Sequence, residues 1–154
     1  VSMNASRTVT GAHDIAILCD VTADDILPEL SPEKLEMLLL PGGKAGVDNL
    51  DSDSRTDRFL SEAKKAGAFV CAICAGPSLL GKKGWLRGKK AVCYPGFESY
   101  LLDAEVLDEP VVCDGKIITA KAAGAAQEFS FSLIEALRGR EAALQVKNAV
   151  YFEK

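Results

Sequence analysis

Histidine is nearly absent from this chain, and its scarcity limits the chemistry that the chain can perform. His13 supplies the one imidazole among 154 residues. With one histidine, the chain has few residues from which to build a histidine general base and cannot form a zinc site with several histidine ligands. The Cys71-x-x-Cys74 pair also has no second pair at ligand spacing. We expect neither a metal nor another cofactor in this protein.

An excess of positive charge and long apolar runs are absent too. The formal net charge is -4 at pH 7, so the chain has no basic field to attract nucleic acid. No apolar stretch approaches the roughly 20 residues that a membrane-spanning helix needs. The first residues lack the basic and apolar regions of a secretory signal. We therefore expect no nucleic-acid or membrane partner and a cytoplasmic location.

The chain also lacks an even number of cysteines that could all pair in disulfides. The five cysteines are Cys19, Cys71, Cys74, Cys93 and Cys113. An odd set, in a chain long enough to bury a core, does not need disulfides for stability, and we expect reduced thiols. A redox dithiol at Cys71 and Cys74 is an alternative. It is disfavoured because both sulfurs of such sites lie at a helix entry, whereas Cys71 falls inside an apolar run.

The chain has enough apolar residues to form one hydrophobic core, since 48% of its residues are hydrophobic. We predict a single domain over residues 1–154. Short apolar runs alternate with segments of helical spacing, which favours an α/β domain with a mostly parallel sheet. The predicted strands are 15–18, 38–40, 70–73 and 117–119. The predicted helices begin near Ser54 and Gln127, and Asp114-Gly115 predicts a hairpin between 111–113 and 116–120.

The stretch from Phe69 to Pro77 is the centre of the functional argument. An apolar strand stops at Cys74, and the small residues that follow, with Pro77, predict a sharp turn into a helix. A thiol at such a turn faces the positive end of the helix, which favours the nucleophilic thiolate. The simpler alternative is a buried cysteine that packs as a small hydrophobe.

A second turn, Pro41-Gly42-Gly43, follows the predicted strand 38–40. Its glycines allow backbone N–H groups to approach a ligand, although a plain tight turn would have the same sequence. Ligands of parallel sheets bind at the carboxyl ends of the strands. We therefore expect this turn and Cys74 to converge on one pocket.

Several motifs occur together in a known order: Pro41-Gly42-Gly43, Ala72-Ile73-Cys74-Ala75-Gly76-Pro77, Tyr94-Pro95-Gly96 and Asp114-Gly115. In this the chain resembles the DJ-1/ThiJ/PfpI superfamily over residues 14–150. The resemblance implies that Cys74 is the reactive cysteine, and that the backbone N–H groups of Gly43 and Ala75 bind an oxyanion beside it. It also implies a flavodoxin-like α/β fold with helices on both faces of the sheet, and a homodimer.

The chain departs from the family pattern at three points. The family's first strand and the loop with its glutamate have no counterpart before His13, so we expect the first β-α unit to be lacking or present as a separate chain. The protease-like branch has a histidine directly after the cysteine, where this chain has Ala75. No histidine follows Cys74 at all. We therefore favour the DJ-1/ThiJ branch and not a protease.

Two functions fit these residues. As a glyoxalase or deglycase, the Cys74 thiolate would add to a small reactive carbonyl compound. As a redox sensor or chaperone-like protein, Cys74 would react with peroxide and form a sulfinate without turnover. A catalytically silent relative is the third alternative. In either active case, Cys74 should have a strained backbone, and the other four cysteines should be buried and slow to react.

Overall fold

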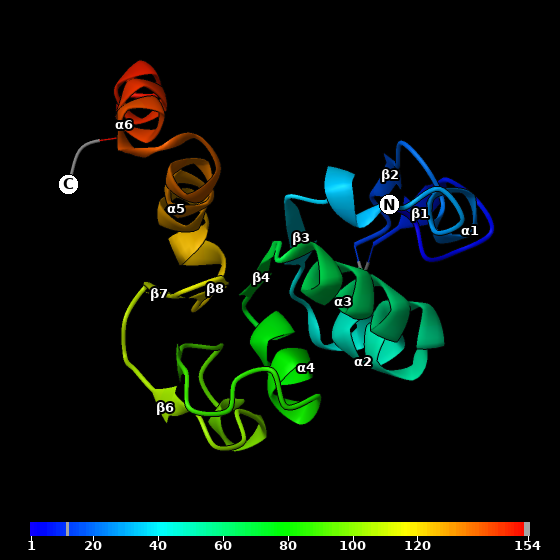
Figure 1. Cartoon of the computed structure of the whole chain (residues 1–154), viewed down its shortest axis with the longest axis horizontal. Coiled ribbons are helices and arrows are strands. Elements are labelled where there is room, and N and C mark those ends of the chain that lie inside the picture. The colour runs from blue at the N-terminus through cyan, green and yellow to red at the C-terminus, as the bar shows by residue number, and fades with distance from the viewer. Residues whose placement is uncertain (12, 153–154) are drawn as a thin grey trace.

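A mixed sheet lies at the centre of the computed structural model, which describes residues 1–11 and 13–152 (Figure 1). Its strands are, in spatial order, β3 (Met37–Leu40), β4 (Phe69–Ile73), β8 (Ile117–Ala120) and β7 (Val111–Asp114). The first three are parallel, and β7 forms an antiparallel hairpin with β8. The hairpin predicted from Asp114-Gly115 is confirmed, and Gly115 has the positive φ (63°) that such a turn needs.

Helices cover both faces of this sheet (Figure 1). One face carries α2 (Lys44–Ser52), α3 (Ser54–Ala66) and α4 (Gly76–Lys82); the other carries α5 (Ala126–Arg138), against which α6 (Arg140–Ala149) packs. Side chains of β4 alternate between the faces. Val70 and Ala72 join a core cluster with Leu60 of α3, whereas Cys71 packs in a second cluster with Phe129 of α5. The predicted α/β fold is confirmed.

Shorter elements complete the chain. They are β1 (Thr8–Thr10), β2 (Ala16–Leu18), α1 (Ala23–Ile26), β5 (Lys90–Ala91), β6 (Glu105–Val106) and the 3-10 turns η1 (Pro32–Lys34), η2 (Glu98–Tyr100) and η3 (Ala123–Ala125). In residues 1–11 and 13–152, we find no helix whose length and apolar character would let it cross a membrane.

The predicted position of one strand was wrong. The run 15–18 was expected in the central sheet, but β2 pairs antiparallel with β1 in a separate two-stranded sheet. Ile15, Ile17 and Leu18 are 67%, 62% and 68% exposed, so this sheet buries little apolar surface. An apolar run predicts a strand but not its partner, because pairing is set by the tertiary contacts.

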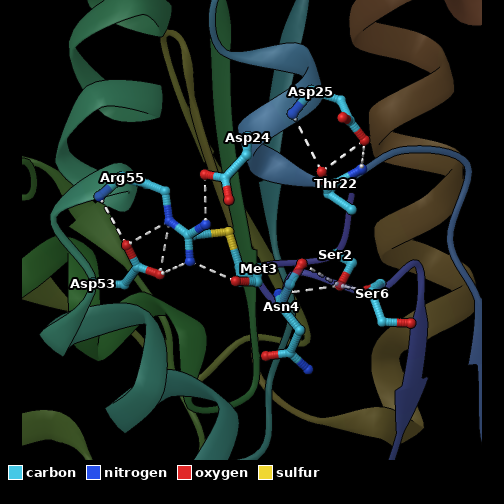
Figure 2. A network of polar contacts seen from close by, with 9 residues as sticks. All are labelled: Ser2, Met3, Asn4, Ser6, Thr22, Asp24, Asp25, Asp53 and Arg55. Atoms are coloured by element: carbon cyan, nitrogen blue, oxygen red, sulfur yellow. Dashed lines mark hydrogen bonds and ion pairs between the residues drawn. The ribbon is translucent and has the colours of Figure 1, made fainter.

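The Arg55 side chain links the N-terminal segment to the start of α3 through hydrogen bonds (Figure 2). Its guanidinium donates to the carbonyl of Met3, to Asp24 of α1 at 2.8 Å and to Asp53 at 2.7 Å. Asp53 is also the N-cap of α3, since it accepts a hydrogen bond from the Arg55 backbone N–H. One planar side chain therefore joins three segments through fork-shaped, charge-assisted hydrogen bonds.

We predict that Arg55→Ala loosens the N-terminal segment. The variant leaves the Met3 carbonyl and two carboxylates without their shared donor, so trypsin should cut after Arg7 several-fold faster than in the wild type. Arg87→Ala is the control, because Arg87 forms an exposed ion pair with Asp103 at 3.4 Å, and such pairs contribute little. Equal cleavage rates at Arg7 in the wild type and Arg55→Ala would contradict the prediction.

Candidate functional site

Cys74 sits in a strained turn between β4 and α4. Its φ is 64°, in the left-handed region that costs a non-glycine residue roughly 1–2 kcal/mol. Two backbone hydrogen bonds hold it there: the Cys74 N–H donates to the Ala120 carbonyl at 2.9 Å, and the Tyr94 N–H donates to the Cys74 carbonyl at 2.8 Å. The predicted backbone strain is confirmed. The Cys74 side chain is half-buried, so a small molecule can reach it.

The glycine turn after β3 lies directly against Cys74. A Cβ atom placed on Gly42 would come within 2.6 Å of the Cys74 Cβ and 3.3 Å of its Sγ. Gly76, at the start of α4, is equally confined, because a Cβ there would lie 3.0 Å from the carbonyls of Leu40 and Pro41. The two turns therefore touch at the carboxyl ends of adjacent parallel strands, as predicted, and a pocket between them stays a prediction.

Gly43 and Ala75 flank this contact. Gly43 has a φ of 86° and is the N-cap of α2, and Ala75 is the N-cap of α4. Within the described part of the chain, neither N–H group donates to a protein acceptor. The family resemblance implies that both groups bind an oxyanion beside the Cys74 sulfur, and this role stays a prediction.

The other cysteines differ from one another more than expected. Cys71 and Cys93 are buried, and burial raises the pKa of their thiols to about 12 and about 11. Cys113 is exposed and Cys19 is half-buried, so the expectation of four buried thiols was wrong. Cys113 lies on β7, an edge strand, and Cys19 follows β2 in the separate N-terminal sheet.

The raised pKa of Cys71 predicts a loss of stability at alkaline pH. The unfolded thiol ionises near its ordinary pKa of 9.0, whereas the folded thiol stays protonated to about 12. The stability it contributes is complete below pH 9 and falls above it, by up to about 1.4 kcal/mol per pH unit. Urea unfolding between pH 8 and 11 should give a shallower pH dependence in Cys71→Val than in the wild type. Parallel curves would contradict this assignment.

The sequence did not predict that the segment 92–94 lies beside Cys74, on the side of β8. The Val92 N–H donates to the buried Thr119 Oγ1 at 3.0 Å, and the next residues place the Tyr94 N–H on Cys74. The motif Tyr94-Pro95-Gly96 begins at this contact with Cys74. His13 lies between β1 and β2, in the N-terminal sheet. Among the described residues, no cluster of three His, Cys, Asp or Glu side chains could hold a metal ion.

Comparison with known proteins gives consistent matches. The sequence model of the DJ-1/PfpI family matches residues 1–136. Protein dj-1beta of Drosophila melanogaster is 32% identical over 146 residues, which is 94% of this chain and 76% of the fly protein. A protein named deglycase from Pyrococcus horikoshii is 34% identical over 116 residues, 74% of this chain and 67% of that protein. The chain spans only 31% of DJ-1 homolog B of Arabidopsis thaliana.

Solved structures agree with these matches. The oxidised form of Toxoplasma gondii DJ-1 superimposes with a TM-score of 0.89 at 25% sequence identity, over 99% of this chain and 82% of that one.

Proposed function

Because this chain belongs to the DJ-1/PfpI family, we propose that Cys74 attacks small reactive carbonyl compounds such as α-oxoaldehydes, as a glyoxalase or a deglycase does. The observation that carries the proposal is the half-buried thiol of Cys74, held at a positive φ against Gly42. Nucleophiles of this kind sit on strained turns between a strand and a helix. The Pyrococcus relative named deglycase supports the choice of substrate.

The first chemical step is an addition. The Cys74 thiolate forms a bond to the aldehyde carbon, and the electron pair of the C=O π bond moves to the oxygen. The resulting alkoxide accepts hydrogen bonds from the N–H groups of Gly43 and Ala75, the donors that the family resemblance implies. Water supplies the proton to the alkoxide, which leaves hydroxide and a hemithioacetal. The C–H proton of that carbon then passes to the neighbouring carbonyl carbon through an enediol, and hydroxide cleaves the resulting thioester, which releases the 2-hydroxy acid and the Cys74 thiolate.

The test is a turnover assay with methylglyoxal. The wild-type chain at micromolar concentration should consume many equivalents of methylglyoxal, followed by NMR, and release the corresponding 2-hydroxy acid. The hemithioacetal should be detected on Cys74 by mass spectrometry. Unchanged methylglyoxal together with an unmodified Cys74 would contradict the proposal.

A redox-responsive protein is the second candidate function, and the oxidised state of the Toxoplasma neighbour favours it. In this case peroxide oxidises the Cys74 thiolate to a sulfenic and then a sulfinic acid, which the same two N–H groups stabilise. The two functions separate in one experiment. Sulfinate on Cys74 without methylglyoxal turnover indicates sensing, whereas turnover indicates an enzyme.

A further inference from the structure

A second thiol lies beside Cys74, and the proposed function does not use it. Cys93 directly precedes Tyr94, whose N–H donates to the Cys74 carbonyl at 2.8 Å. The hydrogen bond from Val92 to Thr119 fixes this segment on the other side. A Cα atom lies about 2.4 Å from its own carbonyl oxygen and from the nitrogen of the next residue, so this hydrogen bond keeps the Cα atoms of Cys74 and Cys93 within roughly 8 Å of each other. A disulfide requires roughly 4.4–6.8 Å between Cα atoms, a range that lies inside this limit.

The surroundings of Cys93 shield its thiol from solvent, which suits a disulfide partner of Cys74. Its side chain is 3% exposed and packs in the same core cluster as Leu40 and Ala75, the residues next to the two turns of the site. Burial, then the charges of Glu98 and Cys74, raise the pKa of Cys93 to about 11. An oxidant that reaches Cys74 from solvent has no such access to Cys93.

We propose that Cys93 is the resolving thiol for Cys74, and that the two residues form a reversible disulfide when a peroxide oxidises Cys74. The inference rests on the reactivity of Cys74 in the proposed function. In the first step the thiolate attacks the peroxide, the O–O bond breaks, and Cys74 becomes a sulfenic acid while an alcohol or water leaves. In the second step the Cys93 sulfur bonds to the Cys74 sulfur, and the hydroxyl group leaves as water with the Cys93 proton.

The remaining cysteines do not fit this role. Cys71 lies three residues before Cys74 on an extended strand, which at roughly 3.3 Å per residue places their Cα atoms about 10 Å apart, too far for a disulfide. Cys113 pairs with Ile118 on the side of β8 away from β4, so it lies two strand spacings, about 9.5 Å, from β4 and farther still from Cys74. Cys71 also packs in the cluster with Phe129, on the face of the sheet opposite to Cys93. Cys93 is therefore the partner that the fold provides.

The test treats the wild type, Cys93→Ser and Cys113→Ser with about one equivalent of hydrogen peroxide, blocks free thiols and maps the peptides without reduction. Trypsin leaves Cys74 in peptide 66–82 and Cys93 in peptide 91–116, which also holds Cys113. Glu-C cleavage after Glu98 separates Cys93 from Cys113, and fragment ions distinguish Cys71 from Cys74.

We expect a peptide linked from Cys74 to Cys93 in the wild type and in Cys113→Ser, which dithiothreitol removes. In Cys93→Ser this product should vanish, and the sulfinate fraction on Cys74 should rise several-fold. Cys93→Val repeats the comparison if serine is not tolerated in the core, and the linked wild-type peptide needs no variant. Equal sulfinate in the wild type and Cys93→Ser, with no linked peptide, overturns the inference but leaves a reactive Cys74. An unoxidised Cys74 overturns the inference and the redox-responsive function, whereas the proposed carbonyl chemistry is decided separately by the methylglyoxal assay.

Discussion

Cys74→Ser should reduce the consumption of methylglyoxal to the rate without protein, a loss on the order of 10³-fold or more, because it removes the nucleophile of the covalent path. A serine hydroxyl differs from the thiol by one atom, yet it is not ionised near neutral pH and is a far weaker nucleophile. Initial rates of methylglyoxal loss, followed by NMR, give the measurement.

Cys113→Ser is the matched control for this variant. It makes the same chemical change at an exposed thiol on β7, and it should keep the wild-type rate. Thermal unfolding shows whether both variants are folded. Wild-type turnover in a folded Cys74→Ser would mean that Cys74 is only a packing residue.

Gly42→Ala should slow the alkylation of Cys74 by at least about tenfold and destabilise the fold by roughly 1–3 kcal/mol, as overpacked cores do. The added methyl would lie 2.6 Å from the Cys74 Cβ and 3.0 Å from the Ile73 carbonyl, closer than nonbonded atoms allow. The turn after β3, the strained turn at Cys74, or both must therefore shift. Iodoacetamide kinetics and urea unfolding measure the two effects.

Gly46→Ala provides the comparison within the same segment. A Cβ at Gly46 meets no atom within 4 Å, and the residue lies inside α2. Alanine should therefore stabilise the protein by up to about 1 kcal/mol and leave Cys74 alkylation unchanged. If Gly42→Ala behaved like Gly46→Ala, the contact between the two turns would not control the site.

The features that the sequence predicted correctly depend on neighbouring residues. The turn at Cys74 follows from an apolar strand, small residues and Pro77, all within nine positions. The hairpin of β7 and β8 follows from Asp114-Gly115. The role assigned to Gly43 and Ala75 comes from the family resemblance and stays a prediction, because a backbone N–H leaves no mark of its own in a sequence.

The features that it missed depend on residues far apart in the chain. The run 15–18 is a strand, but it pairs with Thr8–Thr10, a polar segment without a pattern. The exposure of Cys113 follows from its place on an edge strand, which periodicity does not reveal. The contact of Cys74 with the segment of Cys93 joins positions that only the folded sheet brings together.

The central claim is that the strained turn makes Cys74 the reactive thiol of this protein. A brief pulse of substoichiometric iodoacetamide on the folded chain at pH 7, followed by peptide mapping, tests it most directly. The structure predicts that the label accumulates on Cys74 at least about tenfold faster than on the exposed Cys113, and that buried Cys71 and Cys93 stay unlabelled. Labelling of Cys93 or Cys113 as fast as Cys74 would contradict the claim.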